Sequence, residues 1–315
     1  MRDHGGNIDT AKERFGGSDW IDLSTGINRA PYPLPDLPPE VWTQLPTASA
    51  KAALLAAAGE AFATAAPGVA LAGAQAAIQL VPHLLPRGRA RVLAPTYNEH
   101  GASLRAAGWA VEEVATLEAL AGADLAVVVN PNNPDGQRHA PAALRALADR
   151  VGLLVVDESF GDADPELSLL RDPGPALVLR SFGKFWGLAG LRLGFAFGPE
   201  ALIARLAEMA GPWPVSGAAI EIGRRALVDR AWHAATVARL AEDVTRLDAL
   251  AAVAGWRLVG GTALFRSYET PDAIAAQERL AGHRIWSRIF PWSPGWIRLG
   301  LPAPAEWARL EAALG

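Results

Sequence analysis

The 315-residue chain contains no cysteine, so it can form no disulfide bond, thiolate nucleophile or cysteine-ligated iron–sulfur cluster. Only three of its 29 lysine and arginine residues are lysines, namely Lys12, Lys51 and Lys184. The net charge is −4 and no basic run stands out, which gives nucleic-acid binding no electrostatic support. No apolar run approaches the ~20 residues that span a bilayer, and no signal-peptide core follows Met1. We therefore expect a cytoplasmic protein without membrane or nucleic-acid partners.

Several common catalytic motifs are also missing. The six histidines are scattered without the spacing of metal ligands: His4, His83, His100, His139, His233 and His283. No Gly-x-Ser-x-Gly elbow occurs, and Gly183-Lys184 lacks the upstream glycine and following hydroxyl residue of a phosphate-binding P-loop. These absences exclude the common hydrolase and nucleotidase signatures and give no support to a metal site.

Half of the residues are hydrophobic and a fifth are charged, as in an ordinary globular protein. Residues 1–46 are rich in proline and glycine and predict an extended arm, because five prolines between 31 and 39 exclude a regular helix there. Residues 47–199 alternate apolar strands with helices, which predicts an α/β domain with a mostly parallel sheet. Residues 200–315 predict a smaller α+β domain.

The pattern predicts a helix over 48–63, another over 76–84, and strands at 91–94, 109–114, 125–129, 153–156, 176–179 and 193–197. After residue 199 it predicts long helices over 200–210 and 216–254, strands at 256–259, 263–268 and 296–299, and a helix over 272–280. A last helix closes the chain.

Lys184 lies in a glycine-rich apolar segment, residues 180–194, of a chain that otherwise uses arginine as its cation. Arginine stays protonated at neutral pH, whereas a lysine amine can lose its proton and form a Schiff base with a carbonyl. This difference points to pyridoxal 5′-phosphate (PLP) as cofactor. A GC-rich genome would produce the same bias toward arginine, so the lysine count alone does not decide the matter.

Four polar signals follow predicted strands, where ligands bind in open α/β sheets. They are Tyr97, the loop Asn130-Pro131-Asn132-Asn133-Pro134-Asp135-Gly136, Asp157, and Ser181 with Lys184. Taken singly, the loop is typical of a turn, the aspartate of a helix cap and the tyrosine of a core residue. Together, and in this order, they predict a single site.

The chemistry of PLP accounts for these residue types. Lys184 supplies the amine, Asp157 keeps the pyridine nitrogen protonated, Asn133 donates to the ring oxygen O3′, and Tyr97 stacks on the ring. The phosphate needs amides at a helix start, a hydroxyl and a cation. We assign these to Gly73, Ala74 and Gln75, to Ser181, and to Arg192.

The order of these motifs resembles the fold-type I PLP enzymes, and among them most closely the histidinol-phosphate aminotransferase group. The motifs are Gly-Ala-Gln, Pro-Thr-Tyr, Asn-Asn-Pro-x-Gly, Asp-Glu-x-Phe, Ser-x-x-Lys and Gly-Leu-Arg-x-Gly, within residues 70–200. Ile297-Arg298-Leu299-Gly300 extends the match. The resemblance implies that Arg298 clamps the α-carboxylate of the substrate, which a bidentate guanidinium suits. It also implies a homodimer.

The N-terminal segments His4-Gly5-Gly6-Asn7-Ile8 and Asp22-Leu23-Ser24-Thr25-Gly26-Ile27-Asn28 are similar to the threonine-phosphate decarboxylases of cobalamin biosynthesis. Phe160, where the aminotransferases usually carry tyrosine, agrees with this. The resemblance implies decarboxylation of O-phospho-L-threonine to (R)-1-amino-2-propanol phosphate. It makes His4, Gly5, Gly6 and Asn28 candidates for holding a phosphorylated amino-acid substrate.

Three positions depart from the pattern of these families. Gly183 stands where a hydroxyl residue usually precedes the lysine, Asp135 replaces a threonine, and Leu45 stands where relatives often carry a tyrosine that reaches the partner's cofactor. We expect the first and third changes to weaken cofactor retention. Three alternatives stay open: an aminotransferase, a PLP-sensing regulator and a protein with an inactive site. The regulator is the least favoured of them, because residues 1–46 leave no room for a DNA-binding domain.

Overall fold

The computed structural model describes residues 4–315, which form two compact units. The first, here called the sheet unit, comprises residues 32–133 and 137–231. The second, the small unit, comprises residues 4–31, 134–136 and 232–315. The sequence placed the boundaries at 46/47 and 199/200. They lie elsewhere because α7 packs against β2 and α4, and α8 packs against α3, which keeps both helices with the sheet.

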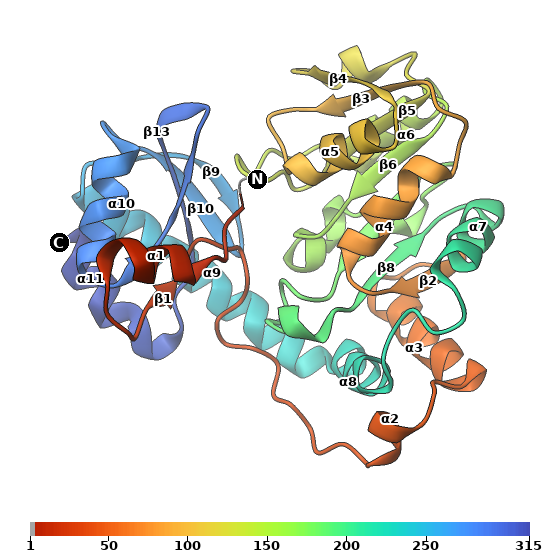
Figure 1. Cartoon of the computed structure of the whole chain (residues 1–315), viewed down its shortest axis with the longest axis horizontal. Helices are drawn as coiled ribbons and strands as arrows, with labels where there is room; N and C mark the ends of the chain where they lie inside the picture. Colours follow the sequence, from red (N-terminus) through yellow and green to blue (C-terminus); the bar gives the residue numbers. More distant parts are fainter. Residues whose placement is uncertain (1–3) are drawn as a thin grey trace. The chain divides into compact units, whose positions relative to one another are not determined.

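The sheet unit is built on seven strands in the order β2-β8-β7-β6-β5-β3-β4 (Figure 1). β8 runs antiparallel to β7 and β2, and the other neighbours are parallel. The mostly parallel sheet expected from the sequence is thus confirmed, although β2 was not predicted. The strands are β2 (Gly68–Leu71), β3 (Arg89–Leu93), β4 (Ala110–Val114), β5 (Leu125–Val129), β6 (Leu154–Asp157), β7 (Leu177–Ser181) and β8 (Gly194–Phe197).

Every residue of β5 and β6 is buried, as expected for central strands of a sheet covered on both faces. One continuous apolar cluster joins alternate residues of these strands, such as Val127 and Val155, to Ile78 of α4, Leu104 of α5 and Leu206 of α7. The helices of this unit are α2 (Glu40–Thr43), α3 (Ala48–Ala61), α4 (Ala74–Leu80), α5 (Asn98–Ala106), α6 (Pro141–Ala148), α7 (Glu200–Ala210) and α8 (Gly217–Val228).

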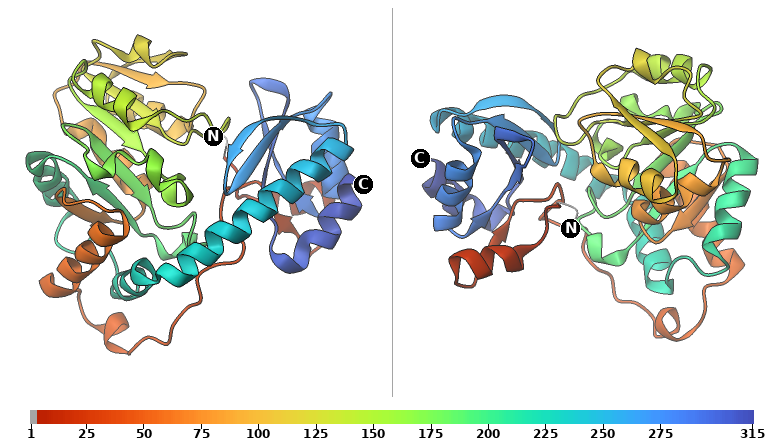
Figure 2. Two further views of the ribbon diagram at one scale, coloured as in Figure 1. Left: turned by 180° about the vertical axis from the view of Figure 1, so that it is seen from behind. Right: turned by 45° about the horizontal axis from the view of Figure 1, so that its top comes forward.

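The small unit contains an antiparallel sheet of order β12-β13-β10-β9 and a short parallel pair, β1 with β11. The long helix α9 lies beside this sheet (Figure 2), and Arg266 and Tyr268 of β10 both donate to Asp248 of α9. The elements are β1 (Ile21–Asp22), β9 (Arg257–Thr262), β10 (Phe265–Glu269), β11 (Ile285–Trp286), β12 (Arg288–Phe290), β13 (Ser293–Gly300), α1 (Ile8–Phe15), α9 (Arg230–Val253), α10 (Ala273–Gly282) and α11 (Trp307–Leu314).

Two sequence expectations were wrong in detail. The single helix expected over 216–254 is two helices, α8 and α9, because the backbone of Asp229 leaves the helical region (φ −81°, ψ 78°). The N-terminal arm is not wholly extended, since α1 forms ahead of the proline-rich stretch that breaks helices at 31–39. Residues 134–136 belong to the small unit, where Ser267 Oγ donates to the carbonyl of Pro134 at 2.5 Å.

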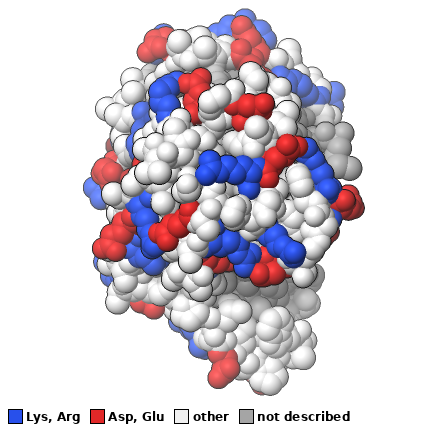
Figure 3. Space-filling view, turned by 90° about the vertical axis from the view of Figure 1, so that its left-hand side faces the viewer, with Lys and Arg blue, Asp and Glu red and all other residues white. Residues whose placement is uncertain are grey.

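Acidic and basic side chains are interspersed on the face drawn in Figure 3, without a large area of one sign. Ion pairs on the surface of the protein include Arg246–Glu311 and Arg309–Asp19, each at 2.5 Å. Within residues 4–315, no helix has both the length and the apolarity needed to cross a bilayer.

Candidate functional site

A cavity of about 140 Å³ lies in the sheet unit. Its lining includes all nine residues that the sequence assigned to the cofactor: Gly73, Ala74, Gln75, Tyr97, Asn133, Asp157, Ser181, Lys184 and Arg192. Phe160 and Gly183 line it as well. The parallel strands β5, β6 and β7 deliver three of these groups because their carboxyl ends meet at one edge of the sheet. The fold therefore brings together residues that are up to 119 positions apart in the chain (73 to 192).

Asp157 is the last residue of β6 and is 2% exposed. Its Oδ2 lies 2.8 Å from His100 Nε2, and its Oδ1 accepts from the backbone N–H and the hydroxyl of Ser159 at 2.9 and 2.5 Å. Burial pushes the pKa of Asp157 upward, but the bonds from His100 and Ser159 outweigh it and hold the pKa below its ordinary value. The carboxylate is therefore ionised at neutral pH even though it is buried.

Sequence reasoning missed His100. It lies in the first turn of α5 and is 2% exposed. The ring of Tyr97 meets it edge to face, with centroids 6.2 Å apart and planes at 83°. A spacing of three residues places Tyr97 and His100 on one face at the helix start, which is the signal that would have suggested a joint role.

Gly73 caps α4 in a left-handed conformation (φ 80°), and the backbone of Ala74 and Gln75 opens the helix after it. A Cβ at Gly73 would come within 2.8 Å of Arg192 Nη2, so only glycine lets this guanidinium approach the helix start. Amides and a cation therefore converge beside the hydroxyl of Ser181, which suits a phosphate group.

Lys184 Nζ lies 5.6 Å from the ring centroid of Phe160, which is buried at the side of the cavity. The preceding Gly183 has a structural reason to lack a side chain. A Cβ there would come within 2.9 Å of the Cα of Ala189, a backbone atom that cannot simply rotate away. A hydroxyl residue at this position would require the segment after Lys184 to shift.

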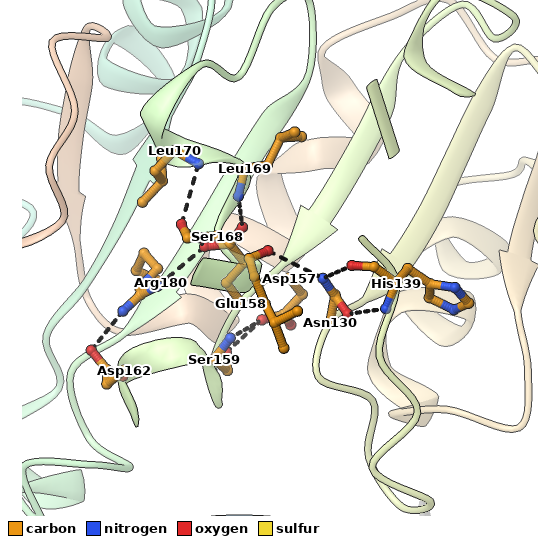
Figure 4. A network of polar contacts seen from close by, with 11 residues as sticks. Asn130, His139, Asp157, Glu158, Ser159, Asp162, Ser168, Leu169, Leu170 and Arg180 are labelled. Atoms are coloured by element: carbon orange, nitrogen blue, oxygen red, sulfur yellow. Dashed lines mark hydrogen bonds and ion pairs between the residues drawn. The ribbon is translucent and has the colours of Figure 1, made fainter. Parts of the chain in front are cut away.

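A buried ionic network supports the strand ends behind the site (Figure 4). Arg180 of β7 contacts Glu158 at 3.1 Å and Asp162 at 2.7 Å, and Glu158 also accepts from the hydroxyl of Ser168 at 2.6 Å. Burial lowers the pKa of Arg180, but the two carboxylates outweigh it, and the net direction is upward. Burial raises the pKa of Glu158. The network ties the residue after Asp157 to the strand that leads to Lys184.

The predicted substrate residues lie in the small unit, where a second pocket of about 920 Å³ is lined by His4, Gly5 and Ser24 among others. Gly6 N donates to Ser24 Oγ at 2.7 Å. The structure does not place Asn28 in this pocket lining. Asn28 is buried, and its Oδ1 accepts from Arg239 at 2.7 Å and from Ala30 N at 3.0 Å, which is a structural role within this unit.

Arg298 is buried in β13, and its Nη2 donates to the carbonyl of Ser24 at 2.7 Å. Arg288 of β12, which the sequence analysis missed, is its direct partner across the ladder and lines the second pocket. Burial, and then the charge of Arg288, lower the pKa of Arg298 to about 9, while Asp22 acts in the opposite direction. Two opposed cations on neighbouring strands repel each other, so an anionic ligand would stabilise them.

The aminotransferase class I and II family matches residues 37–314, so the chain belongs to this family of enzymes. It is 44% identical to a threonine-phosphate decarboxylase of Sinorhizobium sp, over 99% of this chain and 97% of that protein. It is 43% identical to the threonine-phosphate decarboxylase of Pseudomonas aeruginosa, over 100% and 97%. The structure of histidinol-phosphate aminotransferase from Sinorhizobium meliloti in complex with pyridoxal-5′-phosphate has the same fold, with a TM-score of 0.83, 18% identity, and coverage of 98% of this chain and 93% of that one.

PLP is the cofactor of this family, and the residues of the first cavity fit it. Lys184 is an amine beside an aromatic wall, Asp157 is a buried carboxylate, and the glycine cradle with Arg192 suits a phosphate. Within residues 4–315, no group of three or more histidine, cysteine or acidic side chains could hold a metal ion.

Proposed function

We propose that this protein is a PLP-dependent decarboxylase that converts O-phospho-L-threonine to (R)-1-amino-2-propanol phosphate and CO₂, for cobalamin assembly. The observation that carries the proposal is the identity of 43–44% to two threonine-phosphate decarboxylases over essentially the whole chain. The membership in the aminotransferase family and the residues of the cavity support the PLP chemistry.

When bound, PLP supplies a carbonyl carbon for the substrate amine and a ring that accepts the electron pair left on Cα when CO₂ departs. Lys184 provides the amine that attaches the cofactor. Asp157, ionised and fixed by His100 and Ser159, holds the proton at the ring nitrogen.

The remaining residues of the cavity hold the ring and its phosphate. Tyr97 would provide the flat wall, Asn133 would donate to the ring oxygen, and the amides after Gly73 would bind the phosphate with Ser181 and Arg192, all of which line the cavity. Phe160, apolar and buried, supplies no hydroxyl to the ring oxygen. Asn133 is then the donor we assign to that oxygen.

O-phospho-L-threonine carries two anionic groups, a carboxylate and a phosphate. We assign the carboxylate to Arg298, and we add Arg288 because it lies directly opposite Arg298 on the neighbouring strand and lines the second pocket. His4 and the amide of Gly5 are assigned to the phosphate, since both residues line the same pocket as Arg288, whereas the amide of Gly6 already donates to Ser24 Oγ. By holding the carboxylate, Arg298 would orient the bond that breaks, and the Lys184 amine would return a proton to Cα.

We also propose that the protein is a homodimer. Five large apolar side chains of the sheet unit are exposed: Leu34 (68%), Trp42 (67%), Leu45 (63%), Trp213 (54%) and Val228 (51%). Trp42 lies in α2, which packs against α8, and Trp213 lies shortly before α8. Exposed apolar side chains on neighbouring elements favour burial against another chain. Sedimentation of the wild-type protein and of Trp42→Ser tests this, and a monomeric wild type would refute it.

Paired assays test the reaction. With O-phospho-L-threonine, the purified holoenzyme should release CO₂ and an equal amount of aminopropanol phosphate. With the same substrate and a keto acid, amino transfer should be much slower. Transfer of the amino group without CO₂ release would contradict the proposal and favour the aminotransferase alternative, whose fold this chain shares.

A further inference from the structure

We propose that Glu99 is a positioning residue that fixes the orientation of Gln75 and, through it, the ring of Tyr97 in the wall of the cofactor cavity. The inference rests on the proposed PLP site. Gln75 and Tyr97 line the cavity, whereas Glu99 is not among its lining residues. None of the roles assigned above to cofactor or substrate involves Glu99.

The three side chains form a continuous chain of hydrogen bonds. Glu99 Oε2 accepts from Gln75 Nε2 at 3.0 Å, and Gln75 Oε1 accepts from the hydroxyl of Tyr97 at 3.2 Å. Glu99 is 5% exposed, while Gln75 and Tyr97 are half-buried. Gln75 belongs to the first turn of α4, so the chain joins the start of this helix to the start of α5.

An ionised carboxylate can only accept hydrogen bonds, whereas an amide has one accepting and one donating end. Glu99 therefore permits only one orientation of the Gln75 amide, with its NH₂ toward the carboxylate. The amide oxygen then faces Tyr97, and the tyrosine hydroxyl must donate to it. Without an acceptor-only group at position 99, the amide could turn over and the direction of the chain would no longer be fixed.

The same turn of α5 restrains Tyr97 from a second side. His100 meets the tyrosine ring edge to face and also bonds Asp157. Tyr97, Glu99 and His100 thus connect the stacking wall, the phosphate cradle and the buried carboxylate. A negative side chain in the first turn of a helix is favourable in itself, but the helix dipole does not require that side chain to be buried against Gln75.

The proposal makes a prediction of definite sign. Glu99 is an anion that contacts a residue of the phosphate cradle. Electrostatics alone predicts that removing its charge should tighten the binding of an anionic cofactor, because like charges repel. Loss of positioning predicts the opposite. We expect Glu99→Gln to weaken PLP affinity by about 3- to 10-fold, which is the range for loss of one net hydrogen bond.

The dissociation constant of PLP should be measured for wild type, Glu99→Gln, Tyr97→Phe and the double variant, using the visible absorbance of the bound cofactor. Tyr97→Phe removes the hydroxyl on which Glu99 acts. In that background Glu99→Gln should no longer weaken binding. The matched control is Glu113→Gln, an exposed carboxylate paired with Arg105, which should leave PLP affinity unchanged.

Visible circular dichroism at saturating PLP reports how the ring is seated, and it should change in Glu99→Gln but not in the control. Tighter or equal PLP binding in Glu99→Gln would overturn the inference. An equal loss of PLP affinity on introducing Glu99→Gln into wild type and into Tyr97→Phe would overturn it too, because it would indicate general destabilisation. Thermal unfolding without PLP identifies a folding defect. Failure of the wild type to bind PLP would refute the proposed function together with this inference, whereas the other outcomes leave that function intact.

Discussion

His100 Nε2 lies 2.8 Å from Oδ2 of Asp157, and both side chains are almost fully buried. The two residues come from different parts of the sheet unit, the first turn of α5 and the end of β6. This contact opposes the effect of burial on Asp157 and helps keep the carboxylate ionised. In the proposed function Asp157 holds the proton of the cofactor's ring nitrogen, and its charge would then depend on His100, a residue outside the recognised motifs.

We predict that His100→Ala raises the pKa of Asp157, because burial then acts against fewer hydrogen bonds. In the wild type the pKa of Asp157 is lower in the folded protein than in the unfolded chain. Ionised Asp157 therefore stabilises the fold above its pKa in the unfolded chain, and this stabilisation is lost as the pH falls through its pKa in the folded protein. The acid limb of the kcat profile should therefore move to higher pH in the variant. His83→Ala, at an exposed position, is the control. An unchanged acid limb would argue against this coupling.

Lys184→Ala should abolish the visible absorbance of covalently attached cofactor and reduce kcat by several orders of magnitude. Borohydride reduction of the wild-type holoenzyme, followed by peptide mass analysis, should place the cofactor on Lys184. Lys12→Ala is a matched control, since Lys12 is exposed and pairs with Asp9. Labelling of Lys12 or Lys51 in place of Lys184 would refute the assignment.

Anion binding at Arg298 should weaken above about pH 9. The pKa of Arg298 is lowered to about 9 in the folded protein. Below that pH the side chain is protonated, and its buried charge destabilises the fold; this destabilisation decreases as the pH rises above 9 and the folded protein loses the proton. A bound anion offsets this destabilisation only while the arginine is protonated. The affinity for 3-phosphoglycerate, which has a carboxylate and a phosphate but no amine, should fall between pH 8 and 10. Arg288→Leu should shift this decline to higher pH; a decline at the same pH would exclude Arg288 as a cause.

Arg180→Met should destabilise the fold by about 3–5 kcal/mol, because it leaves Glu158 and Asp162 buried without their cation. Urea unfolding at neutral pH measures the change. Burial already raises the pKa of Glu158, so the variant should recover part of its stability at acid pH, where that carboxyl is neutral. Arg205→Met, at an exposed arginine paired with Glu208, should cost less than about 1 kcal/mol. Equal losses for both variants would contradict the role assigned to the network.

Gly183→Ser should not improve cofactor retention, even though the resemblance to PLP enzymes led us to expect a hydroxyl residue there. The added Cβ would lie within 2.9 Å of the Cα of Ala189, and relieving that contact would displace the segment around Lys184. We expect a PLP dissociation constant equal to or higher than that of the wild type. Tighter binding would show that the missing hydroxyl, and not the backbone contact, limits affinity at this position.

The motifs were predictable because each belongs to a short local pattern. A buried strand followed by Asp157, and a strand followed by Ser181 and Lys184, define their own positions at the sheet edge. Parallel strands bring their carboxyl ends together, so the clustering of these residues followed from the strand pattern alone. The division at Asp229 was not predictable in this way, since no proline or glycine stands there to break the helix. The helix α1 could have been read from the helical spacing of Ile8, Ala11 and Phe15 and from the glycines that follow it, but its short length and the proline-rich stretch beyond it favoured an extended arm.

The sequence by itself determined the α/β class, the likeness to PLP enzymes and the residues that now line one cavity. Only the tertiary structure decided the contacts between segments: His100 with Asp157, Glu99 with Gln75, Arg288 opposite Arg298, and the backbone that leaves no room at Gly183. The physical reason is the distance along the chain between the residues that interact. Strand and helix patterns are set by neighbours along the chain, whereas hydrogen bonds and charges inside the fold depend on which distant residues packing brings within a few ångströms.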